Sequence, residues 1–235
     1  MPRRKFNLSW GQALAEIALI FIGITLAVFF NNWNEQRKDS ALRESYYSRL
    51  IAEIEQDRQD LQGIISYHQI RQGSITAFFD FLDAYPSPDP DSLQHYIREI
   101  SYHMSSYVPN ESTFQELIAT GNIKLMPTEV RERLLRLARM HAYVHETYAG
   151  FLNRYDNRRD QLAAIVDEAT FYGLRNNPPR VRNPWTRDHK SAGFQRFSNL
   201  LAVRLNIANT MLQLYATVDK QCEELLNLLA KENQK

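Results

Sequence analysis

One apolar stretch decides the fold: Ala13-Leu-Ala-Glu-Ile-Ala-Leu-Ile-Phe-Ile-Gly-Ile-Thr-Leu-Ala-Val-Phe-Phe30. A helix rises about 1.5 Å per residue, so this stretch extends about 27 Å, close to the thickness of a bilayer's hydrocarbon core. Trp10 precedes the stretch and Trp33 follows it, as expected for aromatic anchors at the two membrane interfaces. The sequence therefore predicts a transmembrane helix over residues 13–33.

The N-terminus has the features of an uncleaved membrane anchor. Residues 1–12 form a short basic N-terminus that begins Met1-Pro-Arg-Arg-Lys5, and no Ala-x-Ala cleavage site follows the apolar stretch. These charges favour an N-terminus in the cytoplasm and place residues 34–235 outside, in the periplasm of a Gram-negative cell. Basic residues after the span oppose this orientation, namely Arg37, Lys38, Arg43 and Arg49.

The composition excludes several classes of protein. Lys and Arg together number 28 and Asp and Glu 27, so no overall positive charge attracts the chain to nucleic acid. Glycine is scarce, with 8 residues, and no Walker or dinucleotide-binding glycine pattern is present. A single cysteine, Cys222, rules out an internal disulfide. We expect the lipid bilayer and other protein chains as partners, and no cofactor.

The residues after the span predict a long helix. No Pro or Gly interrupts residues 24–62, and apolar residues at helical spacing continue to about Gln72, so one helix is expected to leave the membrane without a break. A separate short helix is expected over residues 74–84, before a turn rich in proline. Asp91 or Ser92 is expected to cap the helix that follows the turn.

The middle of the chain predicts one short helix and one long helix. Ser112 is expected to cap the short helix, which ends at Gly121. The long helix is expected to open at Pro127 and to reach about Phe171, with a bend near Gly150.

The last helix, expected over residues 191–231, has the most regular amphipathic pattern of the chain. Its stripe steps by three or four residues through Phe197, Leu201, Arg204, Ala208, Met211, Tyr215, Val218, Cys222, Leu225 and Leu229. A basic loop that contains prolines precedes it over residues 174–190. Because no segment shows strand periodicity, the predicted fold is all-α, with an N-terminal transmembrane helix that continues into an elongated antiparallel helical bundle.

The span carries a distinctive pattern: Ala15-Glu-Ile near its start, Ile22-Gly-Ile in its middle and Asn31-Asn-Trp-Asn-Glu35 at its end. The pattern resembles a family of bacterial single-span membrane proteins known only as a domain of unknown function. The segment Phe114-Gln-Glu-Leu-Ile-Ala-Thr-Gly-Asn-Ile-Lys-Leu125 is similar to the family's Leu-x-Ser-Gly-Asn segment, with Thr120 in place of serine. The resemblance implies a single-span, mainly helical membrane protein with no assigned activity. We expect the bacterial inner membrane as its location.

Polar and small residues of the span form the candidate membrane and assembly site, together with the two tryptophans. Glu16 is a carboxylate in an apolar segment, so we expect it to reach the interface or a neighbouring helix, with a proton or ion role as the alternative. Gly23 and Ala27 have the small-x-x-x-small spacing that lets helices approach closely. Asn31 and Asn32 are expected to hydrogen-bond headgroups, water or neighbouring helices.

Two weaker candidate sites lie outside the span. His141 and His145 have the i, i+4 spacing that can hold zinc, but the order His-Glu-x-x-His is absent and His141 falls on an apolar stripe. A core or interface pair is therefore the favoured interpretation. The basic loop is either a solvated loop or a contact for anionic lipid or an acidic partner, through Arg175, Arg180, Arg182, Trp185 and Arg187.

No catalytic constellation is visible in the sequence, and the Gly-x-Ser-x-Gly elbow is absent. The leading prediction is a non-enzymatic single-span membrane protein that acts as a homo-oligomer or as an accessory, structural subunit of a larger membrane complex. The second is a helical domain that senses a ligand and relays a signal through its continuous helix. The third is a metal-dependent enzyme that uses His141 and His145.

Overall fold

The computed structural model describes residues 10–100, 104–165 and 184–233. Every regular element in these ranges is a helix, and none of the described residues lies in a strand. The α-helices are α1 (Trp10–Ala84), α2 (Pro90–Glu99), α3 (Ser112–Ala119), α4 (Thr128–Ala163) and α6 (Ala192–Glu232), and the 3-10 helices are η1 (Asn122–Leu125) and η2 (Pro184–Arg187). The all-α class predicted from the sequence is confirmed for these ranges.

α1 is one helix of 75 residues, about 110 Å long at 1.5 Å per residue. The expectation of a separate helix over residues 74–84 is wrong, because the backbone of α1 continues through Gly63 and Gly73. A glycine inside a helix lowers the stability of the helix by about 1 kcal/mol relative to alanine. This loss is too small to end a helix whose residues before and after the glycine are well packed. Ile75 and Phe78 are fully buried just after Gly73, and their burial offsets this cost.

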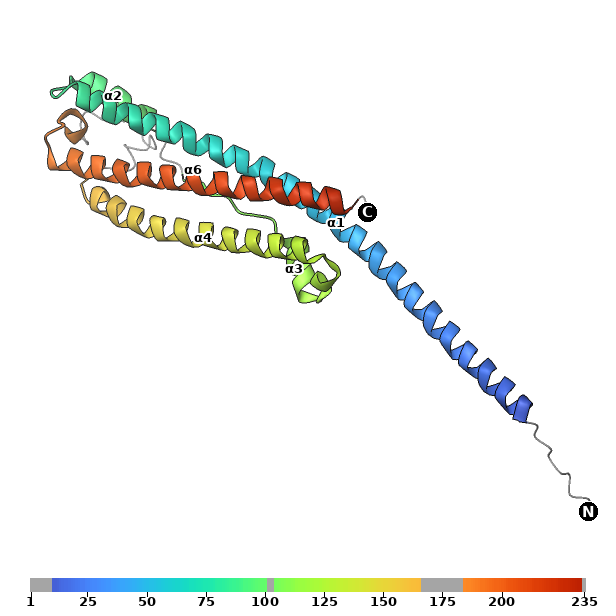
Figure 1. Ribbon diagram of the computed structural model, residues 1–235. Helices are drawn as coiled ribbons and strands as arrows, with labels where there is room; N and C mark the ends of the chain where they lie inside the picture. The colour runs from blue at the N-terminus through green and yellow to red at the C-terminus, as the bar shows by residue number, and fades with distance from the viewer. Residues whose placement is uncertain (1–9, 101–103, 166–183, 234–235) are drawn as a thin grey trace, which may run out of the picture.

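α6 is the central helix of the domain. It packs against both α1 and α4, and lies between them (Figure 1). α6 runs back along the second half of α1, whereas α4 runs in the same direction as α1 (Figure 1). The first part of α1 leaves the domain as a bare helix, in which every residue from Leu14 to Ser45 is exposed.

The predicted stripe of the last helix is buried. Ser191 is the N-cap of α6, and its Oγ accepts a hydrogen bond from the backbone N–H of Phe194 at 3.1 Å. The buried stripe residues include Phe197, Leu201, Arg204, Ala208, Met211, Tyr215, Val218, Cys222, Leu225 and Leu229. Full burial of a large apolar side chain contributes about 1.5–3 kcal/mol, so this stripe is a major source of the domain's stability.

α2 begins earlier than the sequence suggested. Its N-cap is Asp89 rather than Asp91 or Ser92, because Pro90 takes the first helical position, where a missing N–H is tolerated. The Asp89 carboxylate accepts hydrogen bonds from the N–H groups of Asp91 at 3.1 Å and Ser92 at 2.9 Å. The hydrogen bonds from Ser92 are the main reason that the pKa of Asp89 lies below its ordinary value.

α3 is capped from another helix. Ser112 is the first residue of α3 rather than its cap, and Glu53 of α1 accepts a hydrogen bond from the N–H of Thr113 at 3.0 Å. The same carboxylate accepts from the hydroxyl of Thr113 at 2.6 Å. Gly121 ends this region as predicted, in the left-handed conformation that favours glycine, with φ 71°.

α4 is shorter than expected. It opens directly after Pro127 and continues through Gly150, but it ends at Ala163. The expected end near Phe171 is therefore wrong for the α-helix itself, and Phe171 lies outside the described residues. The backbone N–H of Ile165 bonds the carbonyl of Leu162 at 2.9 Å, a 3-10 type bond that tightens the end of the helix.

The close approach of η2 to the start of α6 gives a test of the packing. A Cβ added at Gly193 would lie 2.7 Å from the Cβ of Trp185, so we expect Gly193→Ala to lower the free energy of unfolding by about 1–3 kcal/mol. A matched control is Gly63→Ala in α1, where nothing lies within 4 Å and a stabilisation of about 0.5–1 kcal/mol is expected. Chemical denaturation of both variants checks this, and equal effects of the two substitutions would contradict the packing.

Candidate functional site

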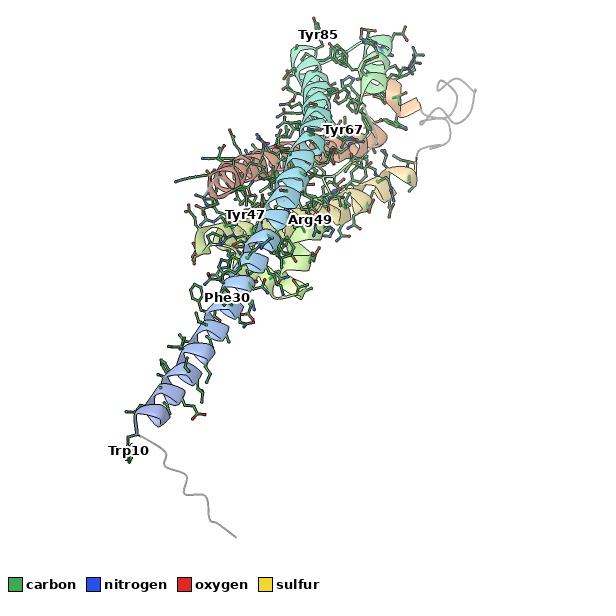
Figure 2. All side chains as sticks on the ribbon, turned by 90° about the vertical axis from the view of Figure 1, so that its right-hand side faces the viewer. Trp10, Phe30, Tyr47, Arg49, Tyr67 and Tyr85 are labelled. Carbon is green, nitrogen blue, oxygen red and sulfur yellow. The ribbon has the colours of Figure 1, made fainter. Side chains whose placement is uncertain are left out.

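The bare part of α1 contains the one helix segment, within the described residues, that is long and apolar enough to cross a membrane. None of this segment is buried in the protein. Trp10 lies at the free end of the bare segment and Tyr85 lies just beyond the other end of α1 (Figure 2). Trp10 is 87% exposed and Trp33 53% exposed, so both indoles are free to meet an interface.

The small and polar residues of the span share one face of α1. Successive residues of an α-helix are about 100° apart, so Glu16, Gly23, Ala27 and Asn34 fall within about 40° of one another. A Cβ added at Gly23 would meet nothing within 4 Å, and Glu16 and Ala27 are both exposed. The result is a weakly polar strip of small side chains, bordered on its two sides by Ile20 and Phe30.

The two asparagines at the end of the apolar segment, Asn31 and Asn32, lie in different surroundings. The side-chain amide of Asn31 donates to Glu35 Oε1 at 3.3 Å, within the same helix. Asn32 is exposed on another side of α1. The side-chain amide of Asn31 thus has one hydrogen-bond partner in its own helix, whereas the side chain of Asn32 is exposed.

The structure separates the two histidines that the sequence suggested as a metal pair. His141 is buried, and its Nδ1 lies 2.8 Å from Glu111 Oε1. His145 is exposed. The described residues contain no group of three His, Cys, Asp or Glu side chains that could hold a metal ion. His141 is better understood as a buried residue that joins α4 to the segment before α3.

Trp185 is not available for the lipid or partner contact that the sequence suggested. Its side chain is 6% exposed, and its ring packs against Phe197 of α6 at 5.2 Å between centroids. The prediction treated the tryptophan as a loop residue, whereas η2 places it in the core. Arg187 forms an ion pair with Asp91 of α2 at 3.2 Å. The other basic residues of this set lie outside the described residues: Arg175, Arg180 and Arg182.

Sequence analysis missed a polar layer inside the domain. Arg71 of α1 and Arg204 of α6 are each 1% exposed, and His68 is 0% exposed. One feature of the sequence could have indicated this layer, because a charged residue, Arg204, occupies a position of the apolar stripe in α6. Buried arginine is rare unless its charge is compensated, so these positions call for an explanation.

Arg71 lies deep in this layer. Its guanidinium carbon lies 4.3 Å from the centroid of the Tyr67 ring, and its Nη1 donates to Met104 Sδ at 3.3 Å. Burial lowers the pKa of Arg71 to about 10, and the positive charge of Arg204 adds to this effect. The positive charges of the two guanidinium groups therefore repel each other inside the protein.

Tyrosines of α4 complete the surroundings. Arg204 lies over the ring of Tyr155 at 5.6 Å, and Tyr148 is also buried. Burial raises the pKa of Tyr148, although the two arginines act in the opposite direction. Tyr148 is therefore a neutral phenol near neutral pH and supplies no negative charge.

A second polar cluster ties the extended segment before α3 to the long helices. The Asp57 carboxylate of α1 is buried and accepts the backbone N–H of Asn110 at 2.8 Å. Burial raises the pKa of Asp57. A cavity of about 30 Å³ lies beside Asp57, Glu111 and His141, with room for about one water molecule. Asp57 and Glu111 each bond a group from another segment, whereas His141 Nε2 is buried without a hydrogen-bond partner among the described residues. We interpret the cluster as structural.

Comparison of the chain with protein-family models, with curated proteins and with solved structures found no match.

The buried imidazole of His68 predicts a dependence of stability on pH. Its Nε2 lies 3.2 Å from the carbonyl oxygen of Ser105, and burial lowers its pKa from the ordinary 6.5. Below pH 6.5 the unfolded chain then binds more protons than the folded one, so stability falls as the pH falls.

We expect His68 to remove about 1 kcal/mol of unfolding free energy between pH 7.0 and pH 5.5. His68→Gln should lose this pH-dependent part, whereas His145→Gln, at an exposed position, should keep it. Denaturant unfolding at the two pH values measures the difference. An unchanged pH dependence in His68→Gln would show that His68 titrates normally in the folded protein.

Proposed function

We propose that this chain is a non-enzymatic, single-span protein of the bacterial inner membrane that acts as a homo-oligomer or as an accessory subunit of a larger membrane complex. The observation that carries the proposal is the exposed apolar segment of α1, because no part of the domain covers it. Exposed apolar surface of this extent requires a membrane or another protein. The resemblance of the span to a bacterial membrane family points the same way.

The geometry of α1 supports an elongated antiparallel bundle that stands away from the membrane. From Phe30 to Ala84 the helix rises about 80 Å, so the far end of the domain lies well beyond the headgroups. In our proposal the N-terminus is cytoplasmic and the domain periplasmic.

The bare segment after the span favours assembly with other helices. Residues 34–45 of α1 are exposed on every side, although helices in water gain most of their stability from packing. Neighbouring helices, from copies of this chain or from another subunit, would supply that packing. The face formed by Glu16, Gly23 and Ala27 would bring the spans together, since small residues permit close approach and a carboxylate gains from a polar partner.

A second function, ligand sensing, is favoured by the polar layer inside the domain. Arg71 belongs to the same continuous helix as the membrane segment. A ligand that altered the packing around Arg71 would therefore act on α1 directly.

The proposal predicts the size of the protein after gentle extraction from its native membrane. We expect a particle that contains several copies of the 27.5 kDa chain, or this chain with other subunits. Light scattering and mass spectrometry of the purified particle provide the measurement. A lone 27.5 kDa protein without partners would contradict the proposal.

The contact face is tested by enlarging its small residues. Gly23→Leu and Ala27→Leu are expected to weaken self-association of the purified chain at least tenfold, because the added side chains hold the helices apart. Ala18→Leu is the matched control, since Ala18 lies on the opposite side of α1 and is also exposed. If Ala18→Leu weakened association as much as Gly23→Leu, the assignment of the face would be wrong.

A further inference from the structure

The charge of Arg71 has no compensating carboxylate among the described residues. Other arginines of α1 form ion pairs, such as Arg49 with Glu116 at 2.5 Å and Arg58 with Asp219 at 2.8 Å. Arg71 is far more buried than either of these, yet it forms no such pair with any residue that the structure describes. Burying an uncompensated charge costs several kcal/mol, and a second guanidinium nearby increases that cost.

The hydrogen bonds of Arg71 leave one edge of its guanidinium without a partner among the described residues. Nη1 contacts Met104, whereas Nε and Nη2 are buried and have no hydrogen-bond partner among the described residues. The N–H groups of Nε and Nη2 lie on the same edge of the planar group and point in parallel. This edge is the fork that binds the two oxygens of a carboxylate, or two oxygens of a phosphate, in a bidentate manner.

Charge and aromatic surroundings fit an oxyanion at this edge. Arg204 places a second positive charge near Arg71, and the two lie between α1, α4 and α6. Tyr155 and Tyr148 are buried beside the two arginines and supply aromatic surroundings. A negative ligand here would compensate the charge of Arg71, whereas a neutral or positive ligand would leave its burial cost unrelieved.

We propose that Arg71 forms, beside Arg204, an internal binding site for a small soluble oxyanion, with the Nε and Nη2 groups of Arg71 as the bidentate clamp. A lipid headgroup does not fit this role, because Arg71 lies about 60 Å along α1 from Phe30, the end of the apolar stretch. The site does not depend on whether the chain assembles, whereas the exclusion of a lipid headgroup rests on the proposed membrane span. Loss of the oxyanion response would therefore overturn the site and leave the proposed assembly untouched.

The experiment measures the melting temperature of the full chain in detergent with added sodium acetate, sodium succinate or sodium phosphate. Sodium chloride at matched ionic strength is the reference. We expect one or more of the oxyanions to raise the melting temperature saturably, by about 3–6 °C at tenfold excess over the Kd. The carboxylate and phosphate arms identify which oxyanion the site prefers.

Arg71→Gln is expected to abolish the response, and Arg71→Lys, which retains charge but lacks the fork, to weaken it at least tenfold in Kd. Arg49→Gln, an exposed position on the same helix, should leave the response unchanged. If Arg71→Gln fails to fold, titration calorimetry with the same oxyanions compares the Kd of the Arg71→Lys variant with that of the wild type. The proposal is overturned if no oxyanion stabilises the wild type beyond chloride, or if the Arg71 variants respond as the wild type does.

Discussion

The backbone hydrogen bonds of α1 run without a break from the apolar N-terminal segment into the core of the domain. Several other elements are placed by this helix, because α6 packs along its second half, Glu53 caps α3 and Asp57 fixes the segment before α3. A helix of this length bends only gently unless a proline, a bulge or an inserted group interrupts it. α1 contains no proline, so the most common cause of a kink is absent from it.

Two kinds of interaction connect α1 to the rest of the domain. The stripe of α6 supplies apolar burial on both of its sides, toward α1 and toward α4. The polar layer around His68, Arg71 and Arg204 interrupts that apolar core. Apolar side chains of similar size would be as stable or more so, and buried charges are therefore weak evidence for a role in stability. Their position between three helices makes more physical sense as a site where a charge is compensated on binding.

Local signals in the sequence predicted much of the fold. The apolar length of the span, the stripe of α6 with Ser191 at its start and the left-handed Gly121 all depend on residues close in sequence. The upright position of the bundle on a membrane and the assembly face are proposals, because both depend on partners outside this chain.

The errors occurred where a distant partner decides the structure. The continuity of α1 past Gly73 depends on Phe78 packing against Phe197 of α6, at 5.9 Å between ring centroids. Trp185 is buried because the Cβ-free Gly193 lets it approach α6, a contact between two segments that no periodicity predicts. The open edge of Arg71 likewise follows from the three-dimensional packing. Single-sequence patterns show which face is apolar, but not which partner covers it.

The continuity of α1 between its apolar segment and the domain is tested most directly by a distance measurement with spin labels. Arg37→Cys and Gln59→Cys place labels at two exposed positions, one in the bare segment and one in the domain, with Cys222→Ala removing the native thiol. In lipid nanodiscs, diluted with unlabelled chain, a continuous helix predicts one narrow distance distribution centred near 33 Å. A broad distribution, or a clearly shorter distance, would reveal a hinge and contradict the account.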